Sequence, residues 1–427
     1  MKILRVGFAG LAVASLVLLV GSTPAAFHSG GVAECAGCHS MHAPKAGGSF
    51  LLVGVDQSST CLTCHQGATD TGPSSYHVST IDGKLGAGLA PLQRGPAGDF
   101  GWLKKTYNYG TGSSAATEDG ATHGHNIKAT DFNYVVDTTN TTAPGGTFSS
   151  AQLACTSCHD PHSSARRLSD GTYRTGNTLG QKAEMIIGSG SYDNSLDPKA
   201  GEAVGVYRLL RGLGDDSQGV TFSDVAIAVA PATYNRTEAA TQTRVAYGAD
   251  GNKTWGNWCA TCHTGMHSRG NYVHPVDEAL DSDIAKNYNA YIKSGDLTGG
   301  AGTSYLSLVP FAEDTGTIST LKAHAKNNDS FLNGPASSDK VMCLSCHRAH
   351  ASGMMYGLRF DIEYEFMVKA GDYVGTDNPD YVNWGSRAAV QSRGRTVGEW
   401  KAAYYDRPAS KFASYQRVLC NKCHAKD

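Results

Sequence analysis

The sequence predicts a single domain of mostly coil and turn, with a few short helices and very little β-structure. Two features of its composition point to this fold class. Glycine supplies 51 of the 427 residues and charged residues make up only 17%, whereas an average chain has about 7% glycine and about 25% charged residues. Ser, Thr and Asn are also frequent, and the apolar runs are brief. We therefore expect no large side-chain core, and something other than side chains must fill the interior.

Residues 1–26 have the layout of a secretory signal peptide. Lys2 and Arg5 form a short positive region, residues 6–20 are almost continuously apolar, and small residues lead to Ala25 and Ala26, where cleavage is expected. The alternative is an uncleaved membrane anchor, but about 15 apolar residues fall short of the ~20 that span a bilayer. The expected mature chain, residues 27–427, is exported, forms one domain and has no membrane span.

The cysteines predict the cofactor. All 12 of them fall into six Cys-x-x-Cys-His units, the attachment signature of c-type haem. Two thiols on one helical turn can each form a thioether with a haem vinyl group, and the adjacent histidine binds the iron. Disulfides and zinc sites also use paired cysteines, but neither requires a histidine after every pair. We predict six covalently bound haem c groups, attached through Cys35, Cys38, Cys61, Cys64, Cys155, Cys158, Cys259, Cys262, Cys343, Cys346, Cys420 and Cys423.

Six haems would supply the missing core. A compact chain of ~400 residues has a radius of gyration near ~21 Å, so six rings must lie close to one another. The fold class is therefore a multihaem c-type cytochrome built around a continuous haem chain, along which electrons can hop. The predicted proximal iron ligands are the motif histidines His39, His65, His159, His263, His347 and His424.

The second ligand of each iron is also expected to be histidine. Sixteen histidines are present, so those outside the motifs outnumber the distal positions to be filled. Methionine is the alternative ligand, and it would raise the reduction potential. The methionines that follow the signal peptide are Met41, Met185, Met266, Met342, Met354, Met355 and Met367.

Several candidate distal ligands lie just after a motif. His42, His162 and His350 each follow a proximal histidine by three residues, which holds them on the proximal side of their own ring. We therefore expect them to reach a neighbouring haem, although each could instead be a surface or hydrogen-bonded histidine. The predicted distal set is His42, His77, His125, His162, His274 and His350, with His324, His267 and His28 in reserve and His123 as the weakest candidate.

The segments between the motifs predict little regular structure. The motifs are unevenly spaced, so no repeat is expected beyond the motif itself. Apolar residues at helical spacing predict one helix over residues 277–293. A capping box, Thr396 with Glu399, predicts a second helix over residues 396–407, ended by Pro408. No linker is evident that would divide the chain.

The positions of the motifs and the charge bear on the partners. Two motifs lie near the mature N-terminus and one lies at the C-terminus. Subunits could therefore pass electrons head to tail, and a head-to-tail contact that does not close gives a filament. The formal net charge is −2 and no basic stripe is present, so nucleic acid is not an expected partner.

The chain resembles the OmcS-type hexahaem cytochromes, which polymerise into extracellular conductive filaments in metal-reducing bacteria. The resemblance covers essentially the whole mature chain, and its extended segments are far more specific than the haem motif. They are residues 27–43 (FHSGGVAECAGCHSMHA), 70–78 (DTGPSSYHV), 98–108 (GDFGWLKKTYN), 234–249 (YNRTEAATQTRVAYGA), 341–354 (VMCLSCHRAHASGM) and 415–427 (YQRVLCNKCHAKD).

The resemblance implies three further properties. The haems would alternate between stacked and T-shaped pairs in one line, and every iron would have two histidine ligands. The histidine matching His42 would enter the next protomer and bind the iron held by Cys343, Cys346 and His347. The other distal pairings are not assigned by the resemblance.

The expected function is electron transfer without catalysis. The first hypothesis is a secreted, filament-forming conduit that carries respiratory electrons to external acceptors such as metal oxides, with other cytochromes as further partners. The alternative is a monomeric periplasmic or outer-surface electron shuttle. A less favoured alternative is a multihaem reductase, which needs an iron with an open position, whereas all six motif histidines are intact.

Overall fold

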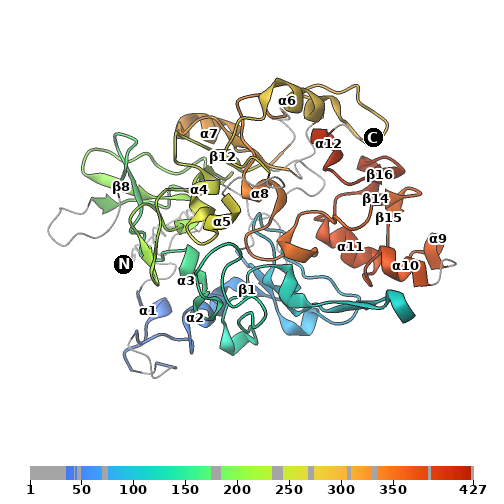
Figure 1. Cartoon of the computed structure of the whole chain (residues 1–427). Helices are drawn as coiled ribbons and strands as arrows, with labels where there is room; N and C mark the ends of the chain where they lie inside the picture. The colour runs from blue at the N-terminus through green and yellow to red at the C-terminus, as the bar shows by residue number, and fades with distance from the viewer. Residues whose placement is uncertain are drawn as a thin grey trace, which may run out of the picture.

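A computed structural model describes most of the chain (Figure 1). Residues 1–26, the expected signal peptide, and His28 lie outside the described residues. In Figure 1 the chain runs from α1 and α2 at the lower left to α12 at the upper right. The described ranges are 35–42, 44–45, 50–69, 76–174, 184–232, 244–267, 274–304, 309–328, 334–382 and 386–424.

The α-helices are short, and the longest one in the described ranges, α6, has 10 residues. No helix in the described ranges is long and apolar enough to cross a bilayer. The helices are α1 (Cys35–Cys38), α2 (Gln57–His65), α3 (Cys155–Cys158), α4 (Trp255–Ala260), α5 (Thr264–His267), α6 (Asp281–Ala290), α7 (Ile318–His324), α8 (Cys343–Cys346), α9 (Pro379–Val382), α10 (Ser386–Gln391), α11 (Val397–Ala403) and α12 (Asn421–His424).

Among the described residues, no strand exceeds four residues, and the strands form small separate sheets. Parallel pairs join β1 (Gln66–Gly67) to β2 (Ser79–Thr80), β7 (Met185–Ile186) to β8 (Glu202–Gly205), and β12 (Ala246–Gly248) to β13 (Ala312–Glu313). The other strands pair antiparallel: β3 (Tyr107–Tyr109), β4 (Ala116–Glu118), β5 (Arg166–Leu168), β6 (Tyr173–Arg174), β9 (Asp216–Ser217), β10 (Val220–Thr221), β11 (Ile227–Val229), β14 (Phe366–Lys369), β15 (Asp372–Tyr373) and β16 (Tyr415–Arg417).

Both predicted helices are present, but they are shorter than predicted. The capping box of α11 forms as expected: the Glu399 N–H donates to Thr396 Oγ1 and the Thr396 N–H donates to the Glu399 carboxylate. The helix then ends early because Tyr405 and Asp406 have positive φ angles of 57°. Similarly, α6 begins only at Asp281, whose own φ is 64°.

Each haem motif lies on a helical turn, as thioether attachment of both thiols requires. Three turns carry the motif alone: α1, α3 and α8. A serine between the two cysteines caps α3 and α8, because Ser157 Oγ accepts from the Ala154 N–H and Ser345 Oγ accepts from the Met342 N–H. In α2 the Asp56 carboxylate accepts from the Ser59 N–H at the first turn.

Side chains build more core than the composition suggested. The largest buried cluster gathers aromatic residues of the C-terminal part, including Trp400, Tyr404 and Tyr373, and the rings of Tyr373 and Tyr404 stack at 5.5 Å. A second cluster surrounds Trp255 and Trp258. The expectation of no large side-chain core was therefore too strict, because a few large aromatic residues bury much apolar surface each.

Candidate haem-binding sites

The proximal histidines are oriented by backbone carbonyls. In five of the six motifs a backbone carbonyl accepts a hydrogen bond from Nδ1 of the proximal histidine, which leaves Nε2 available for a metal. Such a bond fixes both the tautomer and the direction of a ligating imidazole. The pairs are His39 with Phe50 O (2.7 Å), His65 with Tyr76 O (2.8 Å), His159 with Arg208 O (2.8 Å), His263 with Pro144 O (2.9 Å) and His347 with Tyr356 O (2.9 Å).

The thiols of successive motifs are near enough to influence one another electrostatically, in chain order. All twelve cysteines are within the described residues, and none forms a disulfide. In Figure 1 the motif helices follow one another from α1 to α12. Each motif therefore neighbours the next in one continuous series. The neighbouring thiols are Cys38 and Cys64, Cys61 and Cys155, Cys158 and Cys262, Cys259 and Cys343, and Cys346 and Cys420.

Two kinds of thiol contact alternate along this series. The second and third motifs meet through a hydrogen bond between the Cys61 and Cys155 thiols, which raises the pKa of Cys61. The fourth and fifth motifs meet through a matching bond, which raises the pKa of Cys259. At the other junctions the neighbouring thiol acts only through its charge. For example, burial and then Cys262 raise the pKa of Cys158 to about 12.

Four histidines outside the motifs face a proximal histidine. The ring centroids are 6.4 Å apart for His39 and His162, 6.3 Å for His159 and His350, 5.9 Å for His263 and His125, and 6.2 Å for His424 and His274. Two imidazoles that bind one metal through nitrogens about 2 Å away place their ring centroids about 6 Å apart. These pairs therefore have the spacing of two ligands on opposite sides of one iron.

The donor set fits haem. Among the described residues, no three His, Cys, Asp or Glu side chains converge on a common metal position. A haem iron needs only two ligands from the protein, because the porphyrin supplies the other four. Paired imidazoles and free thiol pairs are therefore the arrangement that haem c requires.

Burial keeps several of these imidazoles neutral, the form that can bind a metal. Burial, with His159 as the next cause, lowers the pKa of His350 to about 3. Burial and then His263 lower the pKa of His125. The ring of Phe100 stacks on His350 at 4.5 Å and an interplanar angle of 20°. Phe100 thus holds the His350 ring in the direction of His159.

Two other predicted distal ligands, His42 and His77, are not members of these four pairs. His42 is exposed, and no imidazole of the described residues lies at iron-spanning distance from it or from His347. His77 packs against Gly67, where an added Cβ would come within 2.2 Å of the His77 Nδ1. Gly67 lies two residues after His65, so His77 packs beside the chain segment that carries the second motif.

The weaker candidates are bonded to carboxylates. His267 Nε2 lies 3.0 Å from Asp277 Oδ2, and His324 Nδ1 lies 2.7 Å from Glu313 Oε2. In buried His123, Nδ1 bonds to Trp102 O at 2.9 Å and Nε2 to Glu118 Oε1 at 2.8 Å. Both nitrogens of His123 are engaged, so it is a structural histidine.

Glu118 is the centre of a buried charge cluster that joins distant parts of the chain. Arg393 Nε donates to Glu118 Oε2 at 2.6 Å, and Arg395 donates to Oε1. Burial alone would raise the pKa of Glu118. The hydrogen bond with His123 and the charge of Arg395 outweigh burial and hold the pKa far below its ordinary range.

A dependence of stability on pH follows from this shift. The pKa of Glu118 in the folded state lies below its unfolded value of about 4.3. Its contribution to the free energy of unfolding is therefore complete above the unfolded pKa and is lost as pH falls from about 5 towards the folded pKa. Urea unfolding between pH 7 and pH 3 should show this loss. In the Glu118→Gln variant, the free energy of unfolding should fall less steeply with decreasing pH. An equal slope in the variant would remove Glu118 as its source.

Two arginines support the motifs, and the sequence reasoning missed them. Arg211 Nε donates to Thr156 O at 2.7 Å, inside the third motif. Arg359 Nε donates to Leu344 O at 2.6 Å, inside the fifth. Both arginines follow a leucine, and this shared Leu-Arg pair was the signal available in the sequence. A third missed cation is buried Lys422 in the sixth motif, whose Nζ donates to Tyr291 O and Ser304 O at 2.6 and 2.8 Å.

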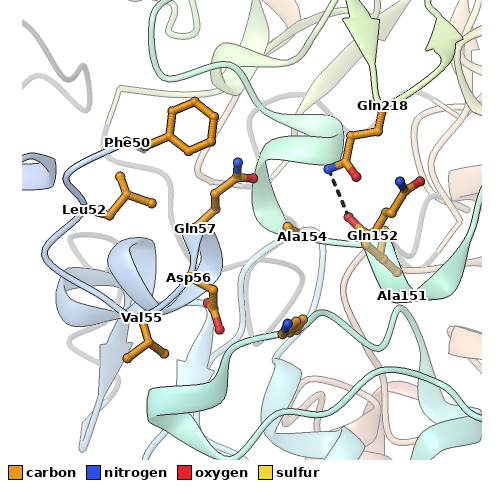
Figure 2. Close-up of a pocket in the computed structure, with 11 residues that line it drawn as sticks. Phe50, Leu52, Val55, Asp56, Gln57, Ala151, Gln152, Ala154 and Gln218 are labelled. Carbon is orange, nitrogen blue, oxygen red and sulfur yellow. Dashed lines mark hydrogen bonds between the residues drawn. The ribbon is translucent and has the colours of Figure 1, made fainter. Parts of the chain in front are cut away.

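A pocket of about 290 Å³ is lined by the loop that follows the first motif and by the segments that precede the second and third motifs. Figure 2 shows Phe50, Leu52 and Val55 along one side of it and Gln152 and Gln218 along the other. Gln218 Nε2 donates to Gln152 O at 3.3 Å. Phe50 also orients His39 through its carbonyl, so the apolar wall of the pocket adjoins the first motif and is suited to contact a porphyrin edge.

Comparison with known proteins is consistent with this geometry. No family model matches the chain. The chain is 50% identical, over 98% of both chains, to the C-type cytochrome OmcS of Geobacter sulfurreducens. Solved structures of OmcS nanowires and of the outer membrane cytochrome S filament from the same organism match with TM-scores of 0.82, at 49% and 50% identity, over 94% of this chain and all of theirs. With paired thiols, anchored imidazoles and this degree of identity, the chain belongs to the OmcS family of c-type cytochromes.

Proposed function

We propose that this protein is a secreted hexahaem cytochrome that polymerises into an extracellular filament and conducts electrons to acceptors outside the cell. The observation that carries the proposal is the continuous series of six motifs, in which a thiol of each motif influences a thiol of the next. The relatives named as nanowires and filaments support the assembly. Residues 1–26 would direct export and be removed, leaving residues 27–427 as one domain.

The haems supply the electron-transfer chemistry, and the chain sets their spacing and environment. The alternation of hydrogen-bonded thiols with thiols that influence each other through charge alone supports two alternating kinds of haem junction. No catalytic residue is required. External acceptors such as metal oxides, and other cytochromes as donors, are the partners that such a conduit needs.

The facing ring pairs support four distal assignments. His162 would complete the iron of His39, His350 that of His159, His125 that of His263, and His274 that of His424. The iron of His347 would be completed by His42 of the next subunit, because His42 is exposed. These assignments make each of those irons six-coordinate.

For the iron of His65 the candidates are His77 and His28. His77 packs against Gly67, two residues after the proximal ligand His65, and would have to reach around to the opposite face of the same iron. The order along the chain favours His28. The ligand proposed for the fourth iron, His125, comes from the segment that precedes the third motif, and the ligand proposed for the sixth iron, His274, comes from the segment that precedes the fifth motif. The corresponding segment for the second iron precedes the first motif and contains His28.

We expect His28→Ala to leave one iron per chain high-spin, because it removes a distal ligand. His77→Ala should leave all irons low-spin and is the matched control. Electron paramagnetic resonance of the purified variants distinguishes the two. The reverse pattern would assign the second iron to His77.

The proposed function is tested on the secreted wild-type protein. Its mass should equal the chain from residue 27 with six haems attached, and negative-stain imaging at neutral pH should show filaments. Particles of single-chain size only would favour the monomeric shuttle. A shift of the haem spectrum on adding nitrite or cyanide would reveal an open iron and favour a reductase.

A further inference from the structure

The first, third and fifth motifs share one backbone arrangement, although no repeat was expected from the uneven spacing. In each, the proximal histidine bonds through Nδ1 to the first residue of a later four-residue loop. We call the motif, its loop and the histidine three residues after the motif a unit. The loops are residues 50–53, 208–211 and 356–359.

The loops match position by position. The second residue has a positive φ in each: 53° at Leu51, 54° at Leu209 and 64° at Gly357. The third residue is always leucine and forms an antiparallel bridge with the proximal histidine. The fourth residue donates its N–H to the carbonyl of the second motif cysteine, at 3.0, 2.8 and 2.8 Å; these donors are Val53, Arg211 and Arg359.

The even-numbered motifs differ. The carbonyl that orients His263 belongs to Pro144, which precedes the motif in the chain. In the second motif the Val78 N–H donates to the carbonyl of His65 itself rather than to that of Cys64. The shared loop is therefore not a general consequence of binding a motif histidine.

Within the chain, each unit reaches back to the one before it. His162 of the third motif faces His39 of the first, and His350 of the fifth motif faces His159 of the third. This rule leaves one group without a counterpart at each end. His42 of the first unit has no earlier motif to reach, and His347 has no later unit to supply a ring.

One chain does not join these two ends. The second, third and fourth motifs lie between the first and the fifth in the thiol series, and Figure 1 shows α1 and α8 well apart. Apolar side chains are also exposed at both ends. Leu51 is 40% exposed where its counterpart Leu209 is 6% exposed, and Tyr356 is 60% exposed.

We propose that the contact between two copies of this chain reproduces the internal contact between successive units. Within one chain, the third-motif unit contacts the first, and the fifth-motif unit contacts the third. Between two copies, the first-motif unit of one would contact the fifth-motif unit of the other in the same way. The polymer would thus continue an internal repeat of two-haem units across the subunit boundary. This inference rests on the proposed filament and adds the geometry of its interface.

A graft tests the equivalence of the units. Ala36→Thr, Gly37→Ser, Ser40→Asp and Met41→Pro together give the first unit the sequence of the third, CTSCHDPH, and should preserve filaments. The control exchanges two neighbours, Met41→His with His42→Met, which keeps the composition but moves the histidine by one position. It should abolish filaments. Haem count by mass spectrometry verifies that both variants are assembled.

A graft variant that carries all its haems but does not polymerise would overturn the inference, and so would filaments formed by the exchanged control. Cryo-electron microscopy of wild-type filaments gives a test that needs no variant. The rotation and translation that superpose one unit on the next should be the same within the chain and across the subunit boundary. Wild-type filaments with a different movement would refute only this inference, whereas absence of wild-type filaments would refute the proposed function.

Discussion

His42→Ala should abolish filament formation and leave one iron per chain without its second histidine. His42 is exposed, and among the described residues no imidazole lies at ligand distance from His347. Under the proposed assignment, removing the His42 ring removes the metal–ligand bond that would both join two subunits and complete the iron of His347. Negative-stain imaging measures the first effect, and the high-spin fraction in electron paramagnetic resonance measures the second.

His267→Ala is the matched control for this variant. His267 also follows a motif histidine closely, but its Nε2 is bonded to Asp277 at 3.0 Å. It should form filaments with the wild-type spectrum. Normal filaments and wholly low-spin irons in His42→Ala would eliminate His42 as the ligand between subunits.

Glu118→Gln should lower the free energy of unfolding by about 3–5 kcal/mol, the usual cost of breaking a buried ion pair by removing one partner. Glu118 and Arg395 are 1% and 0% exposed, so the substitution leaves the guanidinium buried without its counter-charge. The Arg393 bond to the same carboxylate is also weakened. Urea unfolding at pH 7 measures the change.

The control is the same substitution in an exposed pair. Glu365→Gln removes the partner of Arg417, and both side chains are well exposed at 51% and 39%. Such pairs contribute about 0–1 kcal/mol. Similar losses in the two variants would mean that the Glu118 cluster stabilises no more than a surface pair does.

The local features of the fold could be predicted from the sequence. The Cys-x-x-Cys-His units predict helical turns and haem attachment because the chemistry depends on residues within one turn. The capping box of Thr396 and Glu399 is equally local and forms as predicted. The helix boundaries were less accurate, because Asp281 and Tyr405 adopt positive φ angles that no propensity indicates.

Long-range features could not be predicted from spacing. The third motif and its loop at residues 208–211 are far apart in the chain, whereas the fifth motif and its loop at residues 356–359 are close. Insertions of unequal length therefore hide the shared unit. The pairings of His125 with His263 and of His274 with His424 likewise arise from tertiary packing.

The hydrogen-bonded thiols have a consequence for how the protein matures. Cys61 and Cys155, and likewise Cys259 and Cys343, lie in contact although they belong to different motifs. In an oxidising compartment such neighbours readily oxidise to a disulfide, which would consume one attachment point of each of two cofactors. Ligation of the porphyrins must therefore precede the collapse that brings these sulfurs together, or a reductant must protect them until it is complete.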